Sequence, residues 1–215
     1  MKSVIFDLDG TLINSAPDIL GAANRMLAES NIAPIDLETL TSFIGNGLPR
    51  LVELTMEHVG LPLSQHDEMT QKTLAYYNSA SANFTEFYDG VPDFLEYLDS
   101  SGVKMGICTN KPYASTIDIL EKFQITKYFK IVIGGDSLVQ RKPDPMPLQK
   151  AIEFLGAKQA LYVGDSEVDA ETAIRASVPF ALFTRGYRKA AVEELPHLVA
   201  FDNFSELMVK FDKLL

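Results

Sequence analysis

The stretch that decides the fold is VIFDLDGTLINSAPD, residues 4–18. The apolar run at 4–6 leads directly into Asp7, which is typical of a buried strand that ends in a polar residue. Asp9 follows two residues later, so in extended chain its side chain leaves on the same side as that of Asp7. The stretch therefore predicts a strand that delivers two carboxylates to one spot, although Asp and Gly10 also suit a simple turn.

Similar β-rich runs recur along the chain, and helix-like stretches separate the later ones. Alternation of strand and helix favours right-handed crossovers and a parallel sheet that is covered on both faces. The sequence therefore predicts an α/β fold with a Rossmann-like parallel sheet. The expected strands are 3–7, 103–109, 130–135, 160–165 and 179–183, and the expected helices are 91–101, 113–123, 145–156 and 167–177.

A long insert separates the first two expected strands. About 95 residues lie between them, whereas one crossover helix needs only about a dozen. Helical periodicity dominates the insert, with little strand character. We expect a helical domain of residues 15–87 inserted into a core domain of residues 1–14 and 88–215, with helices near 18–30, 37–44, 48–60 and 65–80.

Composition restricts the partners of this 215-residue chain. Its net charge of −10 repels nucleic acid and anionic membranes. Its N-terminus lacks the apolar stretch of a secretory signal, and its single cysteine, Cys108, is compatible with a reducing compartment. We expect a cytoplasmic protein that binds a small molecule, with no nucleic acid and no membrane as partner; the sequence carries no prediction of the oligomeric state.

Polar residues follow the expected strands, and ligands of an open parallel sheet collect beyond the carboxyl ends of its strands. A cluster of carboxylates there either shifts its pKa values or holds a cation, and an all-oxygen acidic site favours Mg²⁺. Each residue also has a simpler interpretation, as a strand end, a turn charge or, for Ser166 and Asp169, a helix cap. Their joint occurrence favours a site made from Asp7, Asp9, Thr109, Asn110, Lys142 and Asp165.

Four segments in this order, "DLDGTL", "ICTNK", "RKPDP" and "GDSEVD", closely resemble the motifs of the haloacid dehalogenase-like hydrolase superfamily. The resemblance covers essentially the whole chain. It implies the parallel-sheet core of that superfamily, and it implies that the insert is the cap domain of the subclass whose cap follows the first motif.

The resemblance also implies roles for the residues at the strand ends. Asp7 would be the nucleophile that forms an aspartyl-phosphate, and Asp9 the general acid and then the general base. Thr109, the Asn110 backbone and Lys142 would bind and stabilise the phosphoryl group.

The same resemblance implies a Mg²⁺ site. Asp7 and Asp165 would bind the ion and Asp9 would contribute its backbone carbonyl. Asp169, together with Ser166, would support the ion in the first or second coordination shell. An acid two residues after the nucleophile favours phosphoryl transfer over dehalogenation.

The insert contains the segment FIGNGLPR, residues 43–50, whose simplest interpretation is a turn between helices with a solvent-facing arginine. The segment resembles part of the cap of phosphoglycolate phosphatases, which implies that Gly47 and Arg50 bind the substrate and that this substrate is 2-phosphoglycolate. A β-phosphoglucomutase-type phosphomutase, a pyrophosphatase and a sugar-phosphate phosphatase remain alternatives. A non-catalytic phosphate-binding regulator is a further alternative from another class, although no expected catalytic position is missing.

Overall fold

The computed structural model describes residues 2–80 and 82–214. Six strands form one parallel sheet in the order β5-β4-β1-β6-β7-β8, and two short strands, β2 and β3, pair separately. The bounds of the sheet strands are β1 Lys2–Phe6, β4 Lys104–Cys108, β5 Phe129–Ile133, β6 Gln159–Gly164, β7 Phe180–Phe183 and β8 Val199–Phe201, and those of the short pair are β2 Ile13–Asn14 and β3 Glu86–Phe87.

The parallel sheet confirms the predicted α/β fold class. Strand β1 is central, and its residue Val4 is in register with Met105 of β4 on one side and with Leu161 of β6 on the other. All five expected strands are present within one or two residues of their predicted bounds. The sequence interpretation missed β8, which adds a sixth strand at one edge of the sheet.

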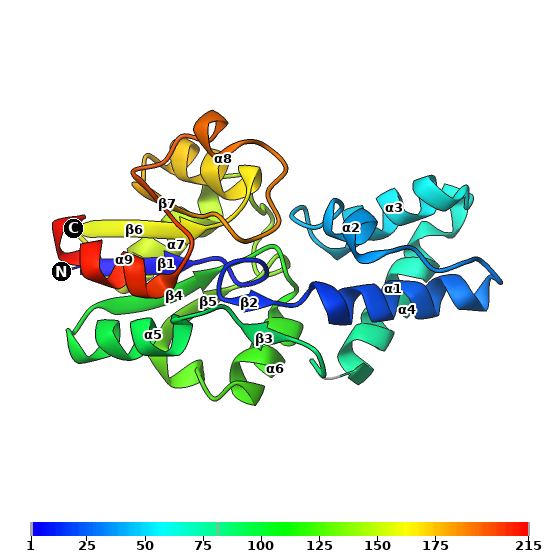
Figure 1. Ribbon diagram of the computed structural model, residues 1–215, viewed down its shortest axis with the longest axis horizontal. Coiled ribbons are helices and arrows are strands. Elements are labelled where there is room, and N and C mark those ends of the chain that lie inside the picture. Colours follow the sequence, from blue (N-terminus) through cyan, green and yellow to red (C-terminus); the bar gives the residue numbers. More distant parts are fainter. Residues whose placement is uncertain (1, 81, 215) are drawn as a thin grey trace. The chain divides into compact units, whose positions relative to one another are not determined.

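Helices cover both faces of the sheet (Figure 1). On one face, α7 packs on β1, β4 and β5, and α8 packs on β6 and β7. On the other face, α5 contacts β4, and α9 contacts α5 and β8. Neighbouring residues of β1 serve the two faces, because Ile5 joins the cluster of Leu148 and Ala151 from α7, whereas the ring of Phe6 meets that of Phe94 from α5 at 6.2 Å. The bounds are α5 Val91–Ser100, α6 Tyr113–Lys122, α7 Met146–Leu155, α8 Glu167–Ala176 and α9 Phe204–Lys210.

The contacts within the chain divide it into two compact units. One unit consists of two chain segments, the first ending at Asn14 and the second beginning at Phe87. The other unit is Ser15–Glu86. The second unit is helical, with α1 packed against α2 and α4, and α3 packed against α4, around apolar residues such as Met26 and Val52. Its helices are α1 Ala16–Glu29, α2 Leu37–Thr41, α3 Leu48–Val59 and α4 His66–Ala80.

A buried carboxylate joins the two ends of the helical unit. Asp18, in the first turn of α1, accepts hydrogen bonds from the backbone N–H of Phe84 at 3.0 Å and from the hydroxyl of Thr85 at 2.6 Å. The side chain of Asp18 is almost completely buried. The chain segments that enter and leave the unit are therefore held side by side.

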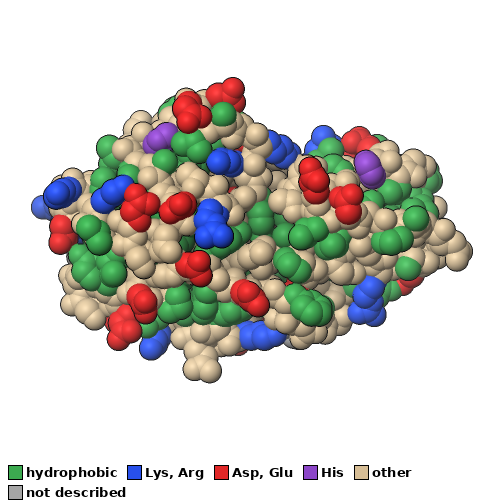
Figure 2. All heavy atoms as spheres, in the orientation of Figure 1, with side chains coloured by type: hydrophobic (Ala, Val, Ile, Leu, Met, Phe, Trp, Pro, Cys, Tyr) green, Lys and Arg blue, Asp and Glu red, His purple; other side chains and the backbone are tan. Residues whose placement is uncertain are grey.

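The surface carries charges of both signs. Figure 2 shows acidic and basic side chains interspersed over the face in view. Among the described helices, none has the length and apolar character needed to cross a membrane.

Candidate active site

The two central strands, β1 and β6, lie at the point where the strand order of the sheet reverses. From β1 the chain proceeds to β4 on one side, and from β6 it proceeds to β7 on the other. Ligands of doubly wound sheets bind at this point, beyond the carboxyl ends of the strands. Asp7 follows β1 and Asp165 follows β6, and the backbone N–H of Asp7 donates to the carbonyl of Val163 at 2.9 Å.

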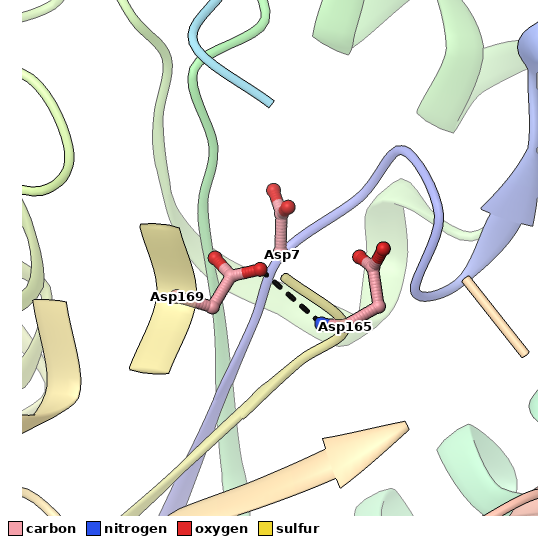
Figure 3. Close-up of side chains that lie close together, drawn as sticks. All are labelled: Asp7, Asp165 and Asp169. Carbon is pink, nitrogen blue, oxygen red and sulfur yellow. Dashed lines mark hydrogen bonds between the residues drawn. The ribbon is translucent and has the colours of Figure 1, made fainter. Parts of the chain in front are cut away.

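Three buried carboxylates meet at this edge. Carboxylate oxygens of Asp7, Asp165 and Asp169 all lie within 4.8 Å of one another. Asp169 comes from the first turn of α8, three residues after its N-cap, Ser166. Figure 3 shows the carboxyl groups of Asp7 and Asp165 directed to the same side, with Asp169 bonded to the backbone of Asp165. The structure thus brings together three of the predicted acidic residues.

Asp169 organises this cluster through both of its oxygens. Its Oδ2 accepts hydrogen bonds from the backbone N–H groups of Asp165 and Ser166, at 3.2 and 3.1 Å, and from the Ser166 hydroxyl at 2.7 Å. Its Oδ1 accepts from Lys142 at 2.7 Å and from the Tyr162 hydroxyl at 2.7 Å. Burial acts to raise the pKa of Asp169, but Lys142 and these hydrogen bonds outweigh it and hold the pKa below its usual value.

Lys142 supplies a buried positive charge to the cluster. Its Nζ lies 3.0 Å from Oδ1 of Asp7, in an ion pair without the alignment of a hydrogen bond, and donates to Tyr162 Oη at 3.0 Å. Burial acts to lower the pKa of Lys142, but Asp169 and Asp7 outweigh this effect and the pKa is raised. The Asn110 amide donates to the Lys142 carbonyl at 3.1 Å, so two predicted site residues support each other.

The cluster carries more negative than positive charge. When all four groups are ionised, three carboxylates and the Lys142 ammonium leave an excess of two negative charges. Burial raises the pKa of Asp7 from 3.8 to about 6, with Asp169 adding to the rise and Lys142 opposing it. Burial and the carboxylates of Asp169 and Asp7 raise the pKa of Asp165 well above its usual range. A divalent cation bound by these oxygens would balance the excess, so the residues fit such an ion.

The carboxyl of Asp165 is held in one orientation by its neighbours. Its Oδ1 accepts from the Thr11 hydroxyl at 2.7 Å and its Oδ2 from the backbone N–H of Tyr187 at 2.6 Å. Gly10 and Gly186 pack directly against it, since a Cβ atom at either residue would lie 2.5 or 2.3 Å from Oδ2. Gly10 also has a φ of +86°, which favours glycine.

Two further predicted residues, Thr109 and Asp9, lie in the segments that follow β4 and β1. Thr109 is buried directly after β4, and its backbone N–H donates to the Ile133 carbonyl at 3.0 Å. Asp9 lies in the turn after β1, where both of its carboxylate oxygens accept from Nζ of Lys111 at 3.1 Å.

The sequence interpretation missed two residues of this network. Lys111 is the last letter of the motif "ICTNK", so its place beside Thr109 and Asn110 was the available signal. Tyr162 lies within β6 in an unbroken apolar run, which indicates only a core aromatic residue. Its hydroxyl lies 3.2 Å from the Cys108 carbonyl and joins the network described above.

Gly47 and Arg50 belong to the helical unit. Gly47 is the N-cap of α3 with a φ of +84°, and Arg50, in the first turn, pairs with Glu53 at 2.7 Å. Their role toward a substrate stays a prediction.

Comparison with known proteins gives a consistent result. The sequence profile of the family described as "Haloacid dehalogenase-like hydrolase" matches residues 4–183. The chain is 46% identical over 209 residues to a protein named phosphoglycolate phosphatase from Cereibacter sphaeroides, with 96% of each chain covered. It is 41% identical to a protein of the same name from Rhodobacter capsulatus, over 95% of this chain and 94% of the relative. The crystal structure of a predicted phosphoglycolate phosphatase from Haemophilus somnus is similar, with a TM-score of 0.93, 29% identity and 98% of each chain covered.

Proposed function

Because this chain belongs to the haloacid dehalogenase-like hydrolase family, we propose that it is a phosphatase that hydrolyses 2-phosphoglycolate to glycolate and phosphate. The observation that carries the proposal is the buried Asp7–Lys142 ion pair beside Asp165 at the strand-order reversal of the sheet. The 41–46% identity to proteins named phosphoglycolate phosphatase supports the choice of ester.

Asp7 is the nucleophile of the proposed reaction. One of its oxygens attacks phosphorus, and the bond from phosphorus to the ester oxygen breaks, which leaves an aspartyl-phosphate and an alcohol. Lys142, 3.0 Å from Asp7, stabilises the negative charge of the transferring group. The hydroxyl of Thr109 and the backbone of Asn110 bind the phosphoryl oxygens.

Asp9 moves the proton in both halves of the reaction. It first gives a proton to the departing ester oxygen, and it then accepts a proton from the water that attacks the aspartyl-phosphate. Hydrolysis releases phosphate and restores Asp7. Alcohols are poor leaving groups without protonation, so Asp9 contributes most to the rate of hydrolysis of alkyl esters.

The cation that we propose for this site is Mg²⁺. Asp7 and Asp165 would hold it together with the backbone carbonyl of Asp9, while Asp169 supports the Asp165 backbone and Lys142 through hydrogen bonds. When bound, Mg²⁺ balances the charge of the carboxylates and of the phosphoryl group.

The helical segment of residues 15–87 is proposed to be the cap. Gly47 and Arg50 lie at the start of α3, where a backbone with positive φ allows close approach and a guanidinium group can bind an anion. In this arrangement cap motion admits the substrate and excludes bulk water during the reaction.

Release of phosphate from a panel of esters tests the function. We expect turnover of 2-phosphoglycolate with Mg²⁺, no turnover with a chelator, and no turnover by Asp7→Asn, whereas Asp118→Asn, an exposed residue of α6, keeps the activity. Equal turnover without Mg²⁺, or none with any ester, would refute the proposal. Glucose 1-phosphate belongs in the panel, because its conversion to glucose 6-phosphate faster than phosphate appears would identify a mutase instead.

A further inference from the structure

The ion pair of Lys111 and Asp9 lies beside the reaction centre, yet the chemistry proposed above assigns no role to Lys111. Nζ of Lys111 is 3.1 Å from each oxygen of the Asp9 carboxylate. The two side chains are only 5% and 14% exposed, so the pair is largely shielded from water. Among the described residues, Lys111 and Lys142 are the buried lysines.

The position of the ammonium group conflicts with proton transfer by Asp9. Nζ of Lys111 is equally distant from both oxygens of Asp9 and has hydrogen-bond geometry to each. It therefore lies between the two oxygens, on the side of the carboxylate that points away from Cγ. An ester oxygen must approach the same side to receive a proton from Asp9. The ion pair therefore has to open before Asp9 can act.

Opening of the pair takes the Asp9 carboxylate away from a buried ammonium, and a second anion at the same place compensates for that loss. In 2-phosphoglycolate only one methylene group separates the ester oxygen from the carboxylate. An ammonium group displaced from Asp9 by that ester oxygen is therefore next to the substrate carboxylate. Of the two buried lysines described in the core domain, Lys142 is already engaged with Asp7 and Asp169, so Lys111 is the one that can bind this group.

We propose that Lys111 determines the specificity of the core domain: it exchanges the Asp9 carboxylate for the substrate carboxylate, and this exchange frees Asp9 to take up a proton from water and pass it to the ester oxygen. The inference rests on the proposed function and deepens it. Esters without a carboxylate offer Lys111 no exchange partner, so they free Asp9 poorly.

The backbone around Lys111 is well fixed, so the exchange requires motion of the side chain alone. The Lys111 N–H donates to the Thr109 hydroxyl at 3.3 Å, and its carbonyl accepts from Gly135 at 2.8 Å. A Cβ atom at Gly135 would lie 2.3 Å from the Asn110 carbonyl oxygen, which shows how closely the two loops pack.

The test compares 2-phosphoglycolate with ethyl phosphate, an alkyl ester that lacks the carboxylate, in the presence of Mg²⁺. Lys111→Met is expected to lower the ratio of kcat/KM for the two esters by about 30- to 100-fold, as for loss of one charged hydrogen bond. Lys111→Arg retains the charge and should keep most of the preference. Lys130→Met, at an exposed residue of β5, serves as the matched control and should leave the ratio unchanged.

An equal loss of kcat/KM for both esters in Lys111→Met would overturn the proposal, because Lys111 would then act only through Asp9. Binding provides a readout that does not need turnover. In the Asp7→Asn background, calorimetry should show that Lys111→Met weakens the binding of 2-phosphoglycolate by about 30-fold or more. The affinity for ethyl phosphate should be nearly unchanged. Unchanged affinity for 2-phosphoglycolate would refute the carboxylate contact, whereas absence of phosphate release by the unmutated protein with intact binding would refute only the proposed function.

Discussion

Replacement of Asp7 by Asn should stabilise the metal-free protein while it abolishes catalysis. The Asp7 carboxylate is buried in a cluster with excess negative charge, and its pKa in the fold is about 6 against 3.8 in its ordinary state. The folded protein therefore binds this proton more tightly than the unfolded chain does. As the pH rises from about 4 through 6, the unfolding free energy of the protein falls. Above pH 6, where Asp7 is ionised in the fold, the loss of unfolding free energy is complete.

The size of the effect follows from the shift of the pKa. A rise from 3.8 to about 6, at about 1.4 kcal/mol per pKa unit, corresponds to about 3 kcal/mol of unfolding free energy. Asparagine resembles the neutral form of the side chain and avoids this cost. At about 2–4 °C per kcal/mol for a chain of this size, Tm should rise by roughly 6–12 °C.

Thermal unfolding with a chelator at pH 8 and at pH 4.5 measures the difference. Asp7→Asn should exceed the unmutated protein in Tm at pH 8, and the gap should narrow at the lower pH or when Mg²⁺ is added to both. Asp118→Asn, which removes an exposed carboxylate, is the matched control and should change Tm little. An Asp7→Asn protein that is no more stable at pH 8, or whose gain does not depend on pH, would refute the electrostatic reasoning.

Further substitutions test the other parts of the site. Asp9→Asn should slow hydrolysis of alkyl phosphates by about 10²-fold or more and that of activated aryl phosphates much less, and equal losses in steady-state kinetics would contradict its role as an acid. Tyr162→Phe removes the hydroxyl that accepts from Lys142 at 3.0 Å, so urea unfolding should show a loss of about 1–2 kcal/mol. Gly186→Ala places a Cβ atom against the Asp165 carboxylate, so the Mg²⁺ concentration for half-maximal rate should rise by about 10- to 100-fold; an unchanged Mg²⁺ requirement would show that this contact is not needed.

The sheet could be predicted because its strands are short apolar runs with a polar residue at the end. Strand β8, Val199–Phe201, has three residues, which is too short for any periodicity to show in the sequence. It becomes a strand because Ala181 and Leu182 of β7 offer a paired edge. Such tertiary pairing is not encoded in a local pattern.

The acidic residues of the site could be predicted for a related reason. The carboxyl ends of parallel strands meet at one edge, so Asp7 and Asp165 were expected to be neighbours as soon as their strands were identified. Lys111 could not be identified in the same way, because a lysine in a turn is usually exposed. Its place in the motif "ICTNK" indicates that it lies near Thr109, but its burial depends on the distant Asp9, and the local sequence does not indicate that contact.

The hydrogen bonds of Asp18 to Phe84 and Thr85 have a consequence for how such enzymes diversify. A long insert whose entry and exit are fastened together attaches to its host as a single loop does, without strain on the strands that it interrupts. Its length and sequence can therefore change by recombination while the host sheet retains its register. Under its proposed role as the cap, Ser15–Glu86 is in this sense an exchangeable cassette, and a lineage that replaced it would change the cap side of the substrate site without having to evolve the phosphoryl chemistry again.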